Sequence, residues 1–269
     1  MKGRHKKISA ALLIVILISA GAIALAVSKN YPVAIVGKKF ITARAWKQDL
    51  AIAGKLEANP DSARVMDQLI KVKKEQELLE QLNIGYSVQT ITDEFNFIKS
   101  DKNQQYEKIL NDDFSGSEQK FIDFAVLPQV YDAALRINYN SDFTANNERY
   151  AKAKDALNQL NEGKIFDDVA KITSDDKISG QLGGDLGFVS EGQILPELWK
   201  VLTKIPTGQP YPNIVISRLG YHVLYPVGTS DKDGRQLIQV KHILIQTEGY
   251  ESWLSSQLKN FTVWHILGS

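Results

Sequence analysis

Acidic and imidazole side chains stand in three short motifs, where side chains of these types can do acid–base or hydrogen-bond chemistry. Asp175 and Asp176 follow a serine, His222 ends a Gly-Tyr-His triplet, and His242 lies in the stretch Val-Lys-His-Ile-Leu-Ile. The chain has no cysteine, which excludes disulfides, thiolate catalysis and cysteine-ligated metals. Its four histidines show no metal-ligand spacing, and no phosphate-binding glycine loop or Ser-His-Asp grouping stands out. We therefore expect neither a metal site nor a cofactor.

A glycine-rich turn lies between the aspartates and the first of these histidines, in the run Gly183-Gly184-Asp185-Leu186-Gly187-Phe188. Glycine adopts positive φ without a steric penalty, and Asp185 can accept hydrogen bonds from neighbouring amides, so we expect a tight turn in which Asp185 is structural. The set continues with Gly192-Gln193-Ile194-Leu195-Pro196-Glu197 and Gly220-Tyr221-His222. In this order and spacing, the motifs resemble the parvulin family of peptidyl-prolyl cis–trans isomerases over roughly residues 146–227.

The resemblance implies a catalytic site that uses no cofactor and no permanent nucleophile. Rotation about an X-Pro bond has a barrier of about 20 kcal/mol, so the site must hold proline, exclude water and stabilise the twisted amide. By analogy with the family, His222 and His242 form a buried hydrogen-bonded pair beneath the amide. Asp176, or Asp175 beside it, completes the polar side. From the residues alone, the histidines can also be a core pair and the aspartates a helix cap.

The resemblance also implies a proline pocket, but the residues expected to line it depart from the family pattern. Ile194 and Leu198 stand where the family has a Met and a Phe, and Leu219 stands at a position that is usually aromatic. Phe188 is the remaining residue that we assign to substrate binding. Because two aromatic walls are missing, a shallow pocket with low or no activity is the alternative expectation.

His242 lies in the wrong order for an ordinary parvulin, whose His-Ile-Leu strand precedes the first helix. Upstream of residue 146 there is no such histidine motif. We expect residues 221–227 to form a strand and residues 231–234 to form a loop that can close a hairpin. Since the family's first strand lies antiparallel to its last, this hairpin would return His242 to the same place. We therefore predict a circularly permuted domain with His242 next to His222; the alternative is the truncated start of a second parvulin repeat.

Composition and the N-terminal residues indicate where the chain is located. A chain of 269 residues with 43% apolar residues and a net charge of +1 fits one or two globular cores and is too balanced for a dedicated nucleic-acid-binding protein. Residues 1–7 hold four basic side chains, and residues 8–27 hold no charge, which is long enough to span a bilayer core of about 30 Å. We expect a cytoplasmic tail, a transmembrane anchor at 8–27 and an extracytoplasmic body. A cleaved signal peptide is the alternative.

The rest of the chain predicts an α+β fold. Residues 31–140 open with two short strands around Gly37, the second ending in a helix cap at Thr42, and continue as helices, as in the N-terminal domain of SurA-like and PrsA-like chaperones. Residues 101–105 are polar, and we expect a turn or loop there. We expect the parvulin-like domain, an antiparallel sheet with helices, at residues 145–247. Residues 250–269 are predicted to return as a helix and a strand, with Val263–Leu267 pairing with Val33–Val36 to complete the chaperone domain.

Together these features predict a single-pass membrane protein that acts outside the cytoplasm on unfolded, exported polypeptides. We expect it to isomerise their X-Pro bonds, with no nucleic acid as a partner. A catalytically silent holdase is the alternative, and a subunit tethered to an envelope or translocation complex is a weaker third reading.

Overall fold

The computed structural model describes residues 28–102 and 105–266, and it has the predicted α+β class with antiparallel sheets. The described residues form two compact units: 28–77 with 260–266, and 78–259 without 103–104. The predicted tail (1–7) and transmembrane anchor (8–27) lie outside the described residues. Within the described ranges, no helix is long and apolar enough to cross a membrane.

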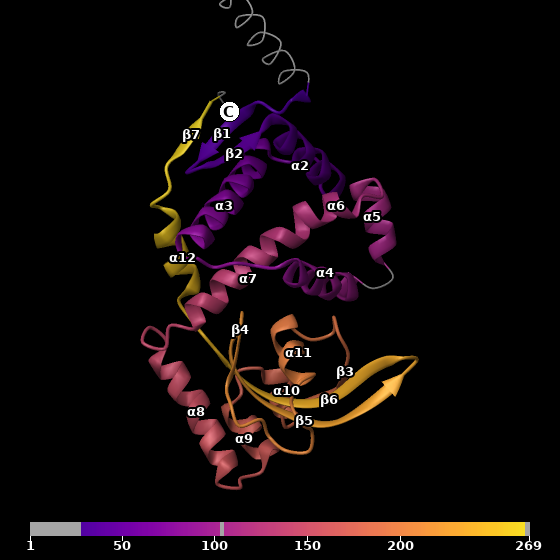
Figure 1. Cartoon of the computed structure of the whole chain (residues 1–269), viewed down its shortest axis with the longest axis vertical. Helices are drawn as coiled ribbons and strands as arrows, with labels where there is room; N and C mark the ends of the chain where they lie inside the picture. Colours follow the sequence, from indigo (N-terminus) through magenta and orange to yellow (C-terminus); the bar gives the residue numbers. More distant parts are fainter. Residues whose placement is uncertain (1–27, 103–104, 267–269) are drawn as a thin grey trace, which may run out of the picture. The chain divides into compact units, whose positions relative to one another are not determined.

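The first unit joins both ends of the described chain in one sheet, with the order β2-β1-β7 (Figure 1). Its strands are β1 (Pro32–Val36), β2 (Lys39–Thr42) and β7 (Val263–His265). Val36 pairs with Val263 and Ala34 with His265, so the predicted return of the C-terminal strand to β1 is confirmed. The strand ends at His265, the backbone N–H of Ile266 still donates to the carbonyl of Val33 at 2.9 Å, and the predicted last residue, Leu267, lies outside the described residues.

Helices α2 (Ala43–Leu56) and α3 (Ser62–Gln81) follow this sheet. Thr42 caps α2 as its sequence position predicts, because its hydroxyl accepts a hydrogen bond from the backbone N–H of Ala45 at 3.2 Å. Glu77 on α3 accepts a hydrogen bond from the backbone N–H of Lys38 at 2.7 Å. The turn between β1 and β2 is therefore fixed to α3.

The second unit begins with a helical segment. It contains α4 (Val88–Lys102), α5 (Tyr106–Phe114), α6 (Glu118–Phe121), the π-helical turn η2 (Ile122–Val126) and α7 (Leu127–Asn140). Pro128 comes directly after η2 in a continuous helical run from Glu118 to Asn140. Because η2 interrupts the regular i→i−4 hydrogen bonds at this point, the helix accommodates a residue that has no N–H. Phe121 is buried edge-to-face against Phe95, Tyr106 and Phe114, so these aromatic rings form a core.

The remainder of the second unit is a sheet with helices. Its elements are α8 (Asn147–Asn161), α9 (Phe166–Thr173), α10 (Lys177–Gln181), β3 (Asp185–Val189), α11 (Pro196–Leu202), β4 (Val215–Ser217), β5 (Gly220–Lys232), β6 (Arg235–Gln246) and α12 (Tyr250–Leu258). The strand order is β3-β6-β5-β4, with antiparallel neighbours throughout. Asp233 and Gly234, both at positive φ, close the β5–β6 hairpin, as predicted for that loop.

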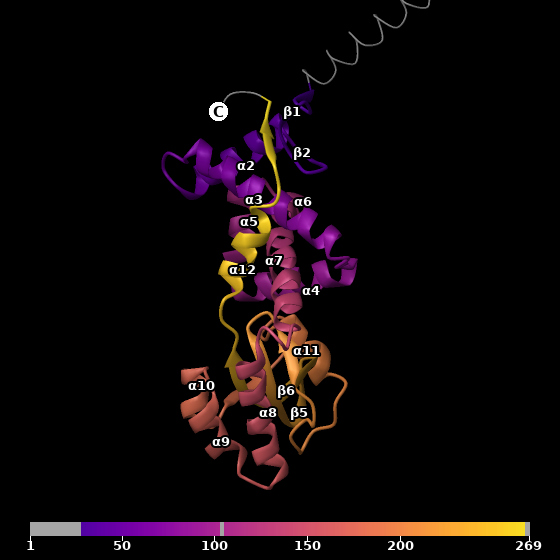
Figure 2. The same cartoon turned by 90° about the vertical axis from the view of Figure 1, so that its left-hand side faces the viewer.

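Alternating residues of this hairpin face two hydrophobic clusters on opposite faces of the sheet. One face packs on α8 and α9 and includes Tyr221, Val223, Ile243 and Ile245. The other packs on α11 and includes Leu224 and Val240. Figures 1 and 2 show α8 and α9 beside the sheet, with α11 on its other side. His222 and His242 alternate with the first set, so their side chains belong to the α11 face.

Candidate functional site

The two histidines lie on neighbouring strands of the same sheet. His222 on β5 pairs with Leu244 on β6, and Leu224 pairs with His242, so the histidines are diagonal neighbours on one face. Their Nδ1 atoms are 3.4 Å apart and the ring centroids 5.5 Å apart. Both side chains are buried. The predicted proximity of His222 and His242 is therefore confirmed, although 20 residues separate them in the chain.

The partners of the ring nitrogens assign one tautomer to each ring. Nε2 of His242 lies 3.0 Å from Oδ2 of Asp176, and an ionised carboxylate only accepts, so this Nε2 carries a proton. Nδ1 of His242 is then an acceptor for the Nδ1–H of His222. Nε2 of His222 in turn accepts from the Ser217 hydroxyl at 2.8 Å. All these hydrogen bonds run in one direction, from Ser217 through two neutral imidazoles to Asp176.

The electrostatics of the site keep both rings neutral and the carboxylate charged. Burial lowers the pKa of His222, and the neighbouring His242 lowers it further. Burial also lowers the pKa of His242, against the opposing effect of Asp176. Burial raises the pKa of Asp176, but hydrogen bonds from Ser179 and His242 outweigh it, so this pKa lies below its usual range. At neutral pH the site is a buried array with one negative end.

Asp176 is held in place by the start of α10, for which it is the N-cap. Its Oδ1 accepts from the backbone N–H of Ile178 and of Ser179, and its Oδ2 accepts from the Ser179 hydroxyl at 2.6 Å. The same hydroxyl lies 3.0 Å from Nε2 of His242. Asp176 is thus both a helix cap and a partner of the histidine pair, which were alternative readings of the sequence.

Asp175 faces a different set of partners. Its carboxylate binds the ammonium of Lys152 at 2.9 Å and the backbone N–H of Gln246 at 3.0 Å, and Arg149 lies 3.6 Å away. Burial raises the pKa of Asp175, but the hydrogen bonds from Lys152 and Gln246 outweigh burial, so this pKa lies below its usual range. Of the two aspartates, the structure brings Asp176 to the histidines, and Asp175 ties α8 to the end of β6.

The glycine turn fixes the strand that carries His242. Gly184 has φ +81°, and its carbonyl accepts the backbone N–H of His242 at 2.9 Å. A Cβ at Gly184 would lie 2.3 Å from the His242 carbonyl oxygen, so only glycine fits this close approach. Asp185 accepts the backbone N–H of Gly187 at 2.8 Å, which confirms its predicted structural role.

The four residues assigned to substrate binding divide into a buried pair and an exposed pair. Ile194 and Leu198 are 7% and 2% exposed and pack in the cluster under α11. Leu219 and Phe188 are 42% and 51% exposed. A role in holding proline stays a prediction for all four residues.

Three residues at the site or next to it were not predicted from the sequence. Ser217 and Ser179 bind opposite ends of the histidine pair, and the spacing Asp-x-x-Ser of a helix cap points to Ser179 alone. No local pattern points to Glu94, which is 124 residues from its partner Arg218. Side chains that meet over such a distance leave no periodic signal.

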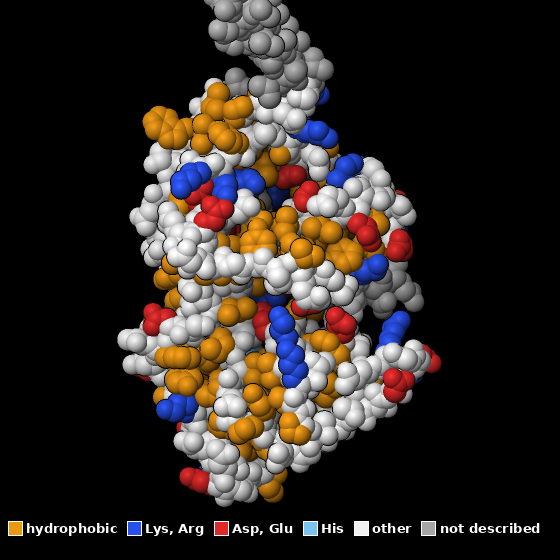
Figure 3. Space-filling view, viewed as in Figure 1, with side chains coloured by type: hydrophobic (Ala, Val, Ile, Leu, Met, Phe, Trp, Pro, Cys, Tyr) orange, Lys and Arg blue, Asp and Glu red, His pale blue; other side chains and the backbone are white. Residues whose placement is uncertain are grey.

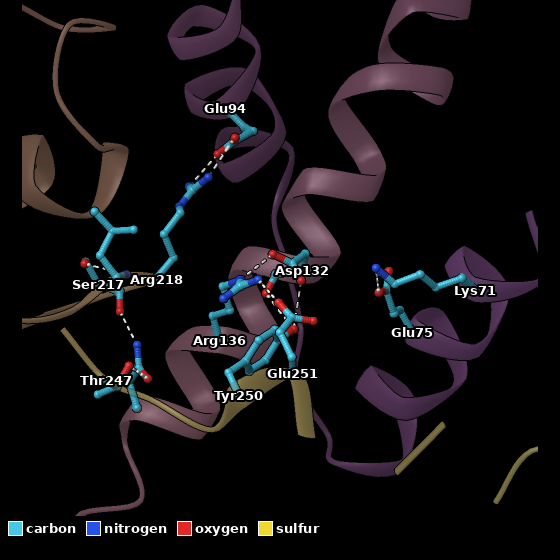
Figure 4. Close-up of polar contacts among 12 residues, drawn as sticks. Lys71, Glu75, Glu94, Asp132, Arg136, Ser217, Arg218, Thr247, Tyr250 and Glu251 are labelled. Carbon is cyan, nitrogen blue, oxygen red and sulfur yellow. Dashed lines mark hydrogen bonds and ion pairs between the residues drawn. The ribbon is translucent and has the colours of Figure 1, made fainter. Parts of the chain in front are cut away.

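Arg218 forms a buried ion cluster next to Ser217 (Figure 4). Its guanidinium donates to both carboxylate oxygens of Glu94 on α4, at 2.8 and 2.6 Å, and to Glu197 on α11 at 2.8 Å. Burial lowers the pKa of Arg218, but the two carboxylates outweigh it and raise the pKa above its ordinary value. Asn140 on α7 donates to the Ser217 carbonyl at 2.7 Å. The turn between β4 and β5 is thus tied to α4, α7 and α11.

An open pocket of about 370 Å³ lies beside this cluster. Its charged lining residues are Asp93, Glu94, Glu197, Lys200 and Arg218, and its apolar lining comes from four segments of the second unit. These apolar residues are Ile84, Val130, Ala133, Ala134, Ile137, Pro196 and Ile216. The pocket thus combines apolar walls with several charged groups at its lining.

A known protein family matches the segment of the chain that contains Asp176 and His222. Residues 135–227 match the family model described as "Rotamase: PPIC-type PPIASE domain". The matched residues include Asp176 and His222 and end before β6, which supplies His242.

Curated relatives are foldases and chaperones by name. Foldase protein PrsA 2 of Bacillus cereus is 27% identical over 139 residues, which cover 47% of this chain and 48% of that protein. Chaperone SurA of Burkholderia pseudomallei is 30% identical over 106 residues, covering 37% of this chain and 23% of that protein. The matched segments therefore span about half or less of these relatives. A crystal structure of peptidylprolyl isomerase (PrsA) from Bacillus anthracis covers 72% of this chain and 86% of its own, at 18% identity and a TM-score of 0.24.

Proposed function

We propose that this chain, which carries a PPIC-type parvulin domain and is homologous to the PrsA and SurA foldases, isomerises X-Pro bonds in unfolded, exported polypeptides. The observation that carries the proposal is the array of Ser217, His222, His242 and Asp176. It joins the matched domain to β6, a strand outside the match, and it leaves no ring nitrogen of the two histidines without a partner.

The array suits a reaction in which no covalent bond is made. The planar amide places negative charge on its carbonyl oxygen by resonance, and the twisted amide places less there, because the resonance is lost. A fixed carboxylate such as Asp176 repels the carbonyl oxygen of the planar form more strongly than that of the twisted form. Rotation is favoured by this difference, and the neutral histidines hold the carboxylate without cancelling its charge.

The same proposal places the body of the protein outside the cytoplasm. Its support is the sequence: four basic residues in 1–7, then twenty uncharged residues in 8–27. A segment of that length spans a bilayer, and basic residues stay on the cytoplasmic side. The chain would then be a single-pass membrane protein whose clients are polypeptides that have crossed the same membrane.

A holdase without isomerase activity is the second candidate, and two observations favour it. Ile194 and Leu198 are packed in the core and replace the residues that form the proline pocket in parvulins. The apolar pocket beside Arg218 offers a surface for an unfolded segment that does not depend on the histidines. This candidate predicts client binding in the absence of catalysis.

A protease-coupled prolyl isomerisation assay on the full, detergent-solubilised chain separates the two candidates. We expect the wild-type chain to accelerate isomerisation. The variant Asp176→Asn, which keeps the size of the side chain and removes its charge, should lower kcat/KM by about tenfold, equivalent to about 1.4 kcal/mol in the barrier. His265→Ala, which removes a histidine from β7 in the other unit, is the matched control and should leave the rate unchanged.

The double variant His222→Ala, His242→Ala tests the pair directly, with circular dichroism to check that it folds. No acceleration by the wild-type chain, together with intact suppression of client aggregation, would overturn the isomerase in favour of the holdase. Equal activity of Asp176→Asn and wild type would remove Asp176 from the mechanism.

A further inference from the structure

The first unit exposes a row of large apolar side chains on one face of its sheet. Ile35 on β1 pairs directly with Phe40 on β2 and with Trp264 on β7. Residues directly opposite in antiparallel strands share a face, so these three side chains form one row across the sheet. Ile266, two residues after Trp264, continues the row past the end of β7.

This row is on the solvent side of the sheet. Ala34 and Val36, which alternate with Ile35, are fully buried, and so is Ile41 on β2. Phe40 and Trp264 are 59% and 67% exposed. Figure 3 shows hydrophobic side chains gathered on the surface over β1 and β7. Large aromatic side chains left in water beside one another mark an interaction surface.

The distance along the chain to the proposed anchor limits where this surface can be. Only Ser28, Lys29, Asn30 and Tyr31 separate the uncharged segment 8–27 from Pro32, the first residue of β1. Even fully extended, four residues reach at most about 14 Å. The polar headgroup region adds roughly 5–8 Å to each side of the hydrocarbon core. The sheet is therefore held at the membrane surface if the anchor spans the membrane.

The side chains around the row fit an anionic lipid surface. Lys29 and Lys38 are exposed, and Lys39 begins β2. Neither the link 28–31 nor β1, β2 and β7 contains an acidic residue. Tryptophan and tyrosine are enriched where proteins meet lipid headgroups, and basic residues near an anionic surface are attracted to it.

We propose that the row of Phe40, Ile35, Trp264 and Ile266 is a membrane-contacting surface that packs into the headgroup region of an anionic bilayer. This inference rests on the proposed anchor and is independent of isomerase activity. The anchor brings the sheet to the lipid, and the aromatic row and its lysines then fix how the first unit lies on it. A second copy of the chain and a client polypeptide are the other occupants that the experiment distinguishes.

Tryptophan quenching in nanodiscs tests the surface. The full chain is reconstituted in nanodiscs of phosphatidylcholine and phosphatidylglycerol in equal parts, with or without a lipid that carries a nitroxide near the head of its acyl chain. The chain has four tryptophans, and we expect the nitroxide to quench part of their emission. Trp264→Phe should lose that quenched part. The matched control Trp46→Phe, in the same unit but on α2, should keep it.

Changing the charge of the row or of the lipid is a second test of the surface. Phe40→Glu places a carboxylate in the row and should reduce the quenching of Trp264, and so should nanodiscs of phosphatidylcholine alone. Equal fractional quenching of wild type and Trp264→Phe, in a chain that stays with the nanodisc through carbonate extraction, would overturn the surface and leave the anchor intact. A chain that carbonate releases would overturn both, while the prolyl isomerisation assay reports separately on the proposed function.

Because the chain has no cysteine, a single engineered thiol tests for the second copy. The variant Trp264→Cys should stay uncrosslinked in nanodiscs under oxidation. An efficient Trp264→Cys disulfide between copies would show that the row joins two chains and would overturn its contact with lipid. Quenching that disappears when an unfolded client polypeptide is added would likewise assign the row to the client.

Discussion

The buried ion cluster of Arg218, Glu94 and Glu197 offers the sharpest test of how the second unit is held together. Side-chain exposure is 14% for Arg218 and 3% for Glu94, so water does not replace a lost partner. Glu94→Gln keeps the shape of the side chain and removes one of its two acceptor oxygens. The new amide NH₂ then faces a guanidinium that only donates.

The expected loss of stability depends on which hydrogen bonds of Arg218 remain in the variant. A hydrogen bond to a charged group contributes about 1.5–3 kcal/mol, and breaking a buried ion pair costs about 3–5 kcal/mol. Since Arg218 keeps its bond to Glu197, we expect Glu94→Gln to lie at the lower end, at about 2–3 kcal/mol. Arg218→Met leaves both carboxylates buried without their cation and should cost about 3–5 kcal/mol.

Hydrogen exchange of the full chain measures this cost where it arises. Loss of about 2–3 kcal/mol from the opening free energy corresponds to about 30- to 160-fold faster exchange in α4 and in the turn between β4 and β5. The matched control is Glu251→Gln. Glu251 is 72% exposed and binds Arg136 on α7, so its variant should change exchange in these segments by less than about fivefold, equivalent to about 1 kcal/mol. If Glu94→Gln and Arg218→Met exchange no faster than Glu251→Gln, the cluster does not tie α4 to the site turn.

Three further predictions concern the array and its supports. The pKa values of His222 and His242 lie below that of an unfolded histidine, so the unfolded chain binds more protons in acid. The free energy of unfolding should therefore be at its full value above a pH of about 6.5 and fall below that pH, by up to about 1.4 kcal/mol per pH unit for each histidine. Urea titrations at several pH values measure this fall. A midpoint that does not change between neutral pH and pH 5 would contradict burial of neutral rings. Gly184→Ala should destabilise the chain by more than about 3 kcal/mol, because the added Cβ meets a backbone oxygen. The control Gly187→Ala, at a similar φ but with open space around it, should cost about 1–2 kcal/mol. Equal melting temperatures of the two variants would refute the steric argument. Ser217→Ala removes the hydroxyl that donates to Nε2 of His222, and it should lower the free energy of unfolding by about 1–3 kcal/mol. It should also shift the ¹⁵N NMR signal of that nitrogen. An unchanged signal would refute the assigned tautomer.

Features that depend on nearby residues could be read from the sequence. The cap at Thr42, the turn at Asp233-Gly234 and the hydrogen bond of Asp185 to Gly187 each involve residues at most three apart, and all are confirmed. Such contacts follow from backbone geometry and short side chains, which tertiary packing rarely overrides. The parvulin motifs and the pairing of β7 with β1 could also be predicted, because a known family supplied the arrangement.

Other predictions were wrong where packing decided. Asp101 and Lys102, predicted as part of a polar loop, continue α4. The turn that closes the hairpin was placed correctly, but β5 continues to Lys232, beyond the predicted end of the strand. Polarity alone does not end a helix or a strand when the preceding turns or the partner strand provide the hydrogen bonds.

For the candidate site, the sequence alone determined which chemistry was available: two histidines, two adjacent aspartates, no thiol and no metal-ligand spacing. Only the tertiary structure decided which of these groups meet. The register of β5 and β6 places His222 and His242 on one face, and the start of α10 directs Asp176, not Asp175, to them. The serines at both ends and the Arg218 cluster arise from contacts between segments far apart in the chain. Their geometry is set by the packing of whole elements, which no single stretch of sequence contains.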